Sequence, residues 1–282
     1  MNQVARRRSS RCVRPHFFLA GALLLLSSIA TAAPSDPLRY QGGIRNSTEG
    51  RRLNDKQLGA VLKSLREKTG FLDLHYDADG FLRLADRERV EGGSAAARAL
   101  VIAAVDAVQL IELENHSRSP VVAFARLAPP IRYESRMTGK QIEVQPLELD
   151  FSDFSHLRGD REVVAAFDLG FGVLHELVHA VLDLRDAGEG HAGPGDCEDY
   201  VNRIRRELRL PERQHYYARV RDVANFPQAG TVKRAELIFA RVVEQGGRTR
   251  TEHFYLNWEA QQVGRIVPYS QGTVRSSTVA MQ

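Results

Sequence analysis

Cysteine is almost absent from this chain. Only two of the 282 residues are cysteine, and Cys12 lies in an N-terminal segment that we expect to be removed. The remaining residue, Cys197, has no partner within the chain, so an internal disulfide is excluded. The fold must therefore depend on the burial of apolar side chains or on a bound metal ion. The hydrophobic fraction of 43% is ordinary for a globular protein, and about 250 residues can bury a sufficient core.

The N-terminal apolar run is too short to span a bilayer. It extends from Phe17 to Ile29, whereas a membrane-spanning helix needs about 20 apolar residues. Five arginines precede the run, and the small residues Ala30-Thr31-Ala32 follow it, as in a secretory signal. We therefore predict a signal peptide over residues 1–32, cleavage before Ala33, and export to a periplasm or beyond the cell. An uncleaved anchor is the alternative; after cleavage we expect no stable membrane association.

An excess of positive charge is also absent once the signal is removed. The chain has 39 basic and 35 acidic residues, and the signal carries five arginines and no acidic residue. The mature protein would therefore have 34 basic residues against 35 acidic ones. This balance gives no electrostatic footprint for nucleic acid, so we expect no nucleic-acid partner.

Hydrophobic periodicity predicts an α+β domain over residues 33–267. The residues after Pro268, to position 282, are polar and predicted to be disordered, and residues 33–52 read as an irregular lead-in. Predicted helices cover residues 54–70, 94–108, 162–184 and 197–208, the third with a weak point at Gly170 and Gly172. Predicted strands form hairpins over 72–84, over 109–115 with 120–127, and over 235–243 with 251–258; a further strand covers 141–151.

The stretch HELVH places chemistry on an otherwise apolar helix. His175 and His179 are four residues apart, so on a helix their rings project from one face and can bind one zinc ion. Glu176, one step around the helix, can reach a water bound to that metal and take its proton. The flanking leucines and valines predict that this helix is buried. The pattern is the HExxH motif, and it predicts a zinc-dependent hydrolase.

On these residues, the chain resembles the zincin metallopeptidases over about residues 160–210. The resemblance implies a zincin-like α+β fold, with an antiparallel or mixed sheet on the HExxH helix, and cleavage of peptide or protein substrates. The metzincin branch would need glycine at 182 and histidine at 185, where this chain has Leu182 and Arg185. The resemblance is therefore to the gluzincins, in which a glutamate on a following helix supplies the third zinc ligand.

Glu198 is the predicted third ligand. It lies at the edge of the apolar face of the helix 197–208, whereas Asp199 points to solvent. The segment from Glu198 to Tyr216 also resembles the region after HExxH in bacterial effector metallopeptidases. There an acidic residue directly precedes the asparagine, and here Val201 does, so other ligands stay open. These alternatives are Asp183, Asp186, His191, Asp196 and Asp199. Asp183 lies a further turn along the helix, so it is better placed to support the ligands than to bind the metal itself.

Two other functions fit parts of the same region. The stretch GDCEDY resembles the nucleophile motif of transglutaminase-like cysteine proteinases, in which Cys197 would attack and His215 or His253 would be the base. Only Asn257 or Glu259 could then orient that base, and HELVH would be unexplained. The second alternative is a non-catalytic exported protein with a structural zinc ion, in which Glu176 would have no role.

We therefore predict an exported zinc metallopeptidase in which His175, His179 and Glu198 bind zinc and Glu176 is the general base. Asn202 and Arg205, on the second helix, are predicted to support the site. Four residues are candidates for stabilising the oxyanion of the transition state: Tyr200, His215, Tyr216 and Tyr217.

Overall fold

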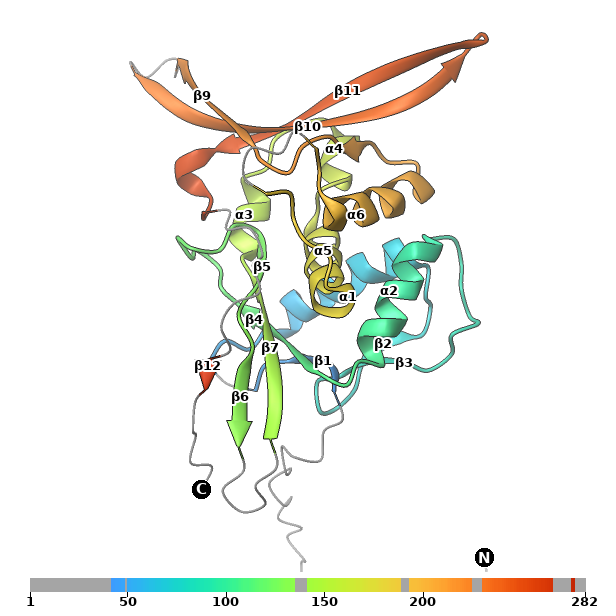
Figure 1. Ribbon diagram of the computed structural model, residues 1–282, viewed down its shortest axis with the longest axis vertical. Helices are drawn as coiled ribbons and strands as arrows, with labels where there is room; N and C mark the ends of the chain where they lie inside the picture. The colour runs from blue at the N-terminus through green and yellow to red at the C-terminus, as the bar shows by residue number, and fades with distance from the viewer. Residues whose placement is uncertain are drawn as a thin grey trace, which may run out of the picture. The chain divides into compact units, whose positions relative to one another are not determined.

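The computed structural model describes residues 42–48, 50–134, 141–188, 193–224, 230–265 and 275–276 (Figure 1). The chain divides into two compact units, Met1–Pro37 and Leu38–Gln282, and every described residue belongs to the second. The predicted signal peptide, the cleavage site before Ala33 and His191 lie outside the described residues. So does the predicted disordered tail, apart from the two residues of strand β12.

The largest sheet has the order β1-β4-β7-β6-β12, and β5 also pairs with β7. Strands β1, β4 and β7 are parallel to one another, whereas β5 and β6 are antiparallel to β7. Strand β12 is parallel to β6. The bounds are β1 Gly43–Asn46, β4 Leu110–Asn115, β5 Ala125–Leu127, β6 Ile131–Glu134, β7 Gln141–Leu149 and β12 Arg275–Ser276.

Two predictions about this sheet are wrong. The segments 109–115 and 120–127 do not form a hairpin, because β7 lies between them and pairs with both β4 and β5. The last six residues of β7 are buried, as expected for a central strand. The alternation of apolar residues in β4 and β5 does not indicate which strand pairs with them. The predicted irregular lead-in contains β1, whose four residues are all buried.

Several local predictions are confirmed. Helix α1 (Asp55–Thr69) ends at Gly70 in the left-handed conformation, and α2 (Ala95–Val105) begins at Ser94, whose side chain accepts from the Ala97 amide. Strands β2 (Leu74–Tyr76) and β3 (Leu82–Leu84) form the predicted hairpin. Capping and turn residues act over a few positions, which is why the sequence alone predicts them.

The helix predicted over residues 162–184 is two helices, α4 (Arg161–Ala165) and α5 (Leu169–Leu182). The break falls before the glycines, at Asp168, whose side chain caps α5 by accepting from the Phe171 amide. Gly170 instead permits close packing on α1, because a Cβ atom there would lie 2.4 Å from the Ser64 hydroxyl. By length and composition the segment Arg161–Leu182 could cross a membrane, yet 56% of its most apolar window is buried inside the protein, as in a core helix.

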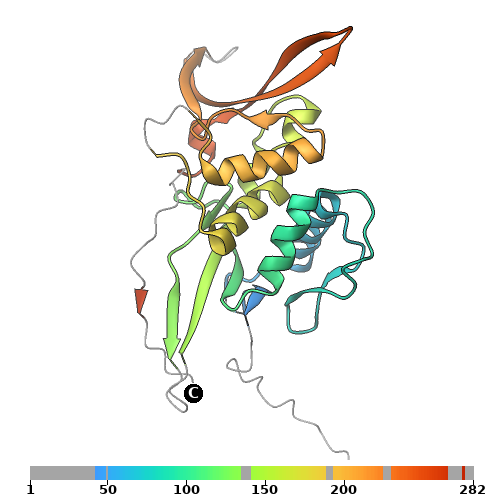
Figure 2. The same cartoon turned by 45° about the vertical axis from the view of Figure 1, so that its right-hand side comes forward.

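Helix α5 lies at the centre of the main core. In both views it runs between α6 (Asp196–Glu207) and the pair α1 and α2 (Figures 1 and 2). Fully buried apolar residues of all four helices meet those of β4 and β7 in one cluster, among them Val61, Leu100, Ile111, Leu147, Leu174, Leu177 and Val201. This packing fixes the position of the HELVH segment.

A second, antiparallel sheet has the order β11-β10-β8, with β9 also paired to β10. Its long hairpin confirms the predicted strands around Gly246-Gly247 and lies beyond α6 in both views (Figures 1 and 2). The α+β class is thus confirmed: the described residues form one mixed sheet, this antiparallel sheet and the two-stranded antiparallel sheet of β2 and β3. The remaining bounds are α3 Phe151–Ser155, β8 Glu212–Arg213, β9 Arg219–Ala224, β10 Thr231–Gln245, β11 Arg248–Glu259 and the 3₁₀ turn η2 Ala260–Gln262.

Asp153 on α3 anchors the chain just before β5. Its carboxylate accepts from the backbone amides of Phe124, at 3.1 Å, and Gly264, at 3.2 Å. Phe124 has a left-handed backbone conformation, with φ of 63°, so the turn that starts β5 needs such support. Burial, together with the nearby charge of Asp150, raises the pKa of Asp153 to about 6.

We expect this carboxyl group to make stability depend on pH. Because its pKa is raised in the folded protein, the folded state binds a proton more tightly, and the free energy of unfolding falls as pH rises from about 4 to about 6. Asp153→Asn can keep both hydrogen bonds but cannot titrate. The difference in unfolding free energy between wild type and Asp153→Asn, measured by urea denaturation, should change by roughly 2–3 kcal/mol between pH 4 and pH 7. Parallel pH profiles would contradict this.

Candidate metal centre

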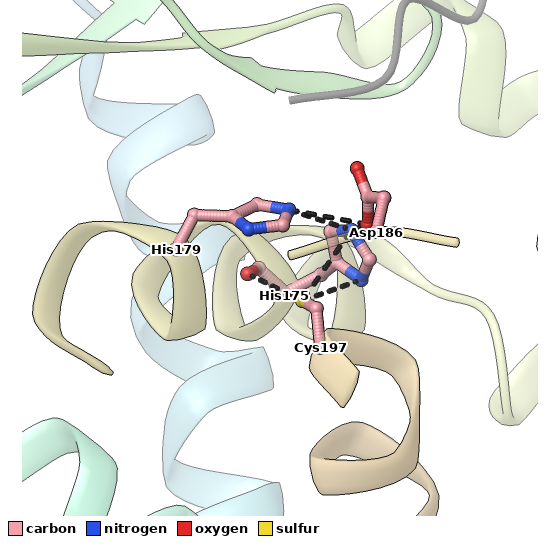
Figure 3. A group of neighbouring side chains, drawn as sticks. All are labelled: His175, His179, Asp186 and Cys197. Atoms are coloured by element: carbon pink, nitrogen blue, oxygen red, sulfur yellow. Dashed lines mark hydrogen bonds and ion pairs between the residues drawn. The ribbon is translucent and has the colours of Figure 1, made fainter. Parts of the chain in front are cut away.

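The two histidines of HELVH point to the same place. Their Nε2 atoms are 3.2 Å apart on the face of α5 (Figure 3). The Nδ1 atom of His179 is 2.6 Å from the Leu184 carbonyl, to which it can donate. That hydrogen bond leaves the Nε2 lone pair of His179 directed at the cluster. The spacing predicted from the sequence therefore brings both imidazoles together.

Asp186 joins these histidines from the loop after α5. Its Oδ1 atom lies 3.0 Å from Nε2 of His175 and 3.3 Å from Nε2 of His179 (Figure 3). Bond lengths of about 2.0–2.2 Å to nitrogen and oxygen place the ligand atoms of a tetrahedral zinc site about 3.2–3.5 Å apart. The three atoms thus have nearly the separations that a shared metal ion requires.

Backbone contacts hold this loop in place. The Cys197 amide donates to the Arg185 carbonyl at 3.0 Å. Gly195 packs so closely on the loop that a Cβ atom there would lie 2.3 Å from the Ala187 nitrogen, and its φ of +84° also favours glycine. The two contacts tie the start of α6 to the residues on either side of Asp186, and so direct its carboxylate at the histidines.

The surroundings of the two histidines favour their protonated, positively charged forms. Burial alone would lower the pKa of His179, but hydrogen bonds to Asp186 and Cys197 raise it to about 10. Burial also opposes the charged form of His175, whose pKa is nevertheless well above its usual value because of Cys197, Asp186 and Glu198. Metal ligation needs unprotonated imidazoles, so a metal ion and protons would compete for these nitrogens.

Glu176 faces a cavity beside the histidines. It is buried, and it accepts a hydrogen bond of 2.8 Å from the Leu127 amide on β5. Burial raises its pKa above the usual value for a glutamate. His175, Glu176 and Asp186 all line this cavity of about 780 Å³, together with residues 123–129. A small molecule or a peptide segment in the cavity could reach the carboxylate.

The structure does not bring Glu198 to the point where the Nε2 atoms meet. Its carboxylate is fully buried between two guanidinium groups: Arg205 donates to Oε1, and Arg213 donates to Oε2 at 2.9 Å. Oε2 also lies 3.4 Å from Nδ1 of His175, on the opposite side of the ring from Asp186. Glu198 therefore contacts the Nδ1 side of His175, whereas Asp186, and not the predicted Glu198, lies beside the two Nε2 atoms.

The residues around Glu198 include two predicted supports. Asn202 accepts from Arg205 at 2.8 Å and also from the Arg213 amide at 2.8 Å. Although burial opposes it, the charges of Arg205 and Arg213 hold the pKa of Glu198 well below its usual value. The contact of Arg213 with Glu198 was not predicted, because Arg213 lies on β8, beyond the helix whose periodicity indicates the buried face.

The other ligand candidates do not belong to the cluster. Asp196 and Asp199 are exposed on the first turn of α6, and Asp183 is exposed at the C-cap of α5. The Nδ1 atom of His179 contacts the Leu184 carbonyl, next in the chain to Asp183. His191 lies outside the described residues.

Glu198→Gln should destabilise the protein. The substitution keeps the shape of the side chain but leaves two buried guanidinium groups without their counter-charge. We expect the free energy of unfolding to fall by roughly 3 kcal/mol. Asp199→Asn on the same turn is exposed and should change it by less than about 0.5 kcal/mol. Equal effects in denaturant titrations would contradict the assignment of Glu198 to this network.

The cysteine hydrolase alternative has little geometric support. Cys197 is fully buried and is not among the described residues that line the cavity, so a substrate cannot reach its sulfur. The sulfur lies 3.5 Å from Nδ1 of His175, and it also interacts with His179; both are residues of HELVH rather than the predicted bases. His253 is exposed on β11, and the His215 carbonyl accepts from Arg213.

Tyr216 is the predicted oxyanion candidate that the structure places at the cavity. Its ring stacks on His175 with centroids 6.1 Å apart, and it lines the cavity. Burial raises the pKa of its hydroxyl well above the usual value, so the proton is kept for donation. The Tyr200 hydroxyl instead donates to the Ala96 carbonyl, and that of Tyr217 donates to the Ala187 carbonyl.

Comparisons of the chain with protein-family models, with curated proteins and with solved structures find no match.

Proposed function

We propose that the protein is an exported zinc-dependent hydrolase, most consistent with a zincin-like metallopeptidase. His175, His179 and Asp186 would hold the metal, and Glu176 would be the general base. Export follows only from the sequence of residues 1–32. The observation that carries the proposal is the convergence of Nε2 of His175, Nε2 of His179 and Oδ1 of Asp186, at 3.0–3.3 Å, beside a buried glutamate of the same helix.

The donor set suits zinc. Two imidazole nitrogens and one carboxylate oxygen are ligands that zinc takes in catalytic sites, where a water molecule completes the shell. Calcium and magnesium prefer oxygen ligands throughout, so the histidines argue against them. Leu184 and Glu198 contact the Nδ1 atoms of the two histidines, as expected for residues that orient metal ligands.

Strand β5 supports a peptide as the substrate. It pairs with β7 along one edge. No described strand covers the other edge, where the Leu127 amide bonds to Glu176 and the Ala125 amide bonds to the Ala123 carbonyl. Residues 123–129 line the cavity next to α5. Carbonyl groups on an uncovered strand edge can accept hydrogen bonds from an extended peptide. A peptide bound there would place a scissile bond near Glu176.

The residues of the site can divide the reaction between them. When bound, zinc would polarise the scissile carbonyl and acidify a water molecule. Glu176 would take the proton of the attacking water, and its raised pKa suits it to pass that proton to the leaving nitrogen. The Leu127 amide holds the carboxylate in position. Tyr216 would donate to the oxyanion of the tetrahedral intermediate.

A structural metal site is the second candidate, and the sulfur of Cys197 near the three ligands favours it. Structural zinc sites usually have four protein ligands and no open position. Such a site gives no reason for a buried glutamate beside the metal at a cavity.

Activity decides between the two functions. Zinc-loaded protein should cleave peptides from an unbiased library, detected by mass spectrometry. Tyr216→Phe should cleave the same peptides with kcat lowered by about 10²–10³-fold and zinc retained, if Tyr216 stabilises the oxyanion. Retained zinc with no cleavage of any peptide by wild type would support the structural site instead.

A further inference from the structure

Cys197 is a free, fully buried cysteine beside the three atoms of the candidate centre. It stands at the start of α6, and Figure 3 shows its side chain directed at His175, among the side chains of His179 and Asp186. One ligand atom from each of these four residues lies within 4.8 Å of each of the others. The proposed hydrolytic mechanism gives this sulfur no role.

The distances suit a fourth ligand. The sulfur lies 3.7 Å from Nε2 of His175. A zinc–sulfur bond of about 2.3 Å and a zinc–nitrogen bond of about 2.0–2.1 Å place the two ligand atoms of a tetrahedral site about 3.5–3.6 Å apart. The sulfur is also 3.5 Å from Nδ1 and 3.6 Å from the carbonyl oxygen of His175. Without a metal, the thiol can therefore form hydrogen bonds in the same place.

The backbone fixes where this sulfur can go. The Cys197 amide donates to the Arg185 carbonyl, next to Asp186 in the chain. The following residue, Glu198, is held by Arg205 and Arg213. Glu198 therefore contacts Nδ1 of His175, whereas the Cys197 sulfur lies at similar distances from Nδ1 and Nε2, within reach of the nitrogen that faces His179 and Asp186.

From this arrangement we infer that Cys197 is the fourth protein ligand of the metal, bound as a thiolate from the interior side of the site. The inference rests on the proposed metal centre. The other side of the site faces the cavity, which His175, Glu176 and Asp186 line. Water would therefore enter from the cavity, either as a fifth ligand or by displacing the thiolate. The thiolate would thereby regulate access of water to the metal.

Cobalt(II) substitution tests the inference without any assay of activity. Cobalt bound to a thiolate shows a sulfur-to-metal charge-transfer band in the near ultraviolet, in addition to visible d–d bands. The full chain would carry Cys12→Ser, so that Cys197 is its sole thiol. We expect both kinds of band in this protein, and only d–d bands after the further change Cys197→Ser. Zinc affinity should fall roughly 10²-fold in that variant, because one of four ligands accounts for about a quarter of the binding free energy.

Val201→Ala is the matched control. Val201 is fully buried one turn further along α6, and its truncation disturbs the core without removing a ligand. It should keep the charge-transfer band. Visible d–d bands with no charge-transfer band in the Cys12→Ser protein would overturn the role of Cys197 and leave the proposed three-ligand centre intact. If no cobalt bands appear at all, the metal centre itself is overturned, and this inference with it.

Discussion

Glu176→Gln is expected to lower the hydrolytic rate by about 10²–10⁴-fold while zinc stays bound. The amide cannot accept the proton of the attacking water, so the chemical step loses its base. Its oxygen can still accept from the Leu127 amide, now 2.8 Å from the carboxylate, and the cavity should keep its shape. The measurement is kcat/KM on a cleaved peptide, with zinc content determined on the same samples.

Gln145→Ala is a control for this result. Gln145 is a buried polar residue of β7 that donates to the carbonyl of Ala128, the residue directly after Leu127 at the end of β5. It touches none of the proposed ligands. We expect its effect on kcat/KM to be far smaller than that of Glu176→Gln. If Glu176→Gln retained full activity, Glu176 would not be the general base. Another carboxylate would then act as the base, or the reaction would need none.

Asp186→Ala is expected to weaken zinc binding by roughly 10²–10³-fold. Structural zinc sites have apparent binding free energies of about 10–16 kcal/mol, so each of four ligands accounts for roughly 3 kcal/mol. Asp186 is the proposed third ligand, because its oxygen contacts both histidines and its side chain is only 2% exposed. Competition with a chromophoric chelator measures the dissociation constant.

Asp196→Ala is the matched control for this change. It removes an exposed carboxylate from the first turn of α6, so it alters the charge near the site by the same amount. We expect less than a threefold change in zinc affinity, because solvent and dissolved ions screen an exposed charge that does not contact the metal. Equal losses in the two variants would refute Asp186 as a ligand. Residues that orient a metal ligand typically contribute about 10–100-fold to metal affinity. If Glu198→Gln lowered zinc affinity by more than this, Glu198 would again be the preferred third ligand.

The sequence predicts the part of the arrangement that a single helix creates. His175, Glu176 and His179 depend only on the α-helical repeat, which a short stretch of sequence determines. The same holds for the caps at Ser94 and Gly70, where the interacting groups are a few residues apart. Local geometry needs no knowledge of the rest of the fold.

The third ligand depends on contacts that a helical repeat does not contain. Glu198 does lie at the edge of the buried face of α6, as its angle on the helix predicts. Its partners decide its role, and Arg213 comes from a strand beyond the helix. Asp186 reaches the histidines only because Gly195 packs on Ala187 and the Cys197 amide bonds to Arg185. Such loop geometry is set by tertiary packing.

The pairing of strands in the largest sheet also depends on contacts between distant parts of the chain. Alternation predicts most strands correctly but not the partners of β4 and β5, because β7 comes between them from later in the chain. Likewise β1 is short and polar in sequence, and its burial follows from pairing with β4. Strand pairing over long separations has no local signature.

The central claim, that HELVH and Asp186 form a metal centre, is tested most directly by zinc titration calorimetry of the metal-stripped protein beside its His175→Ala variant. His175 contacts His179, Asp186 and Glu198, so its removal should abolish the site. We expect one tightly bound zinc ion per chain in the wild type and none in the variant, with circular dichroism showing that both are folded. Failure of the folded wild type to bind zinc, or equal binding by the variant, would contradict the claim.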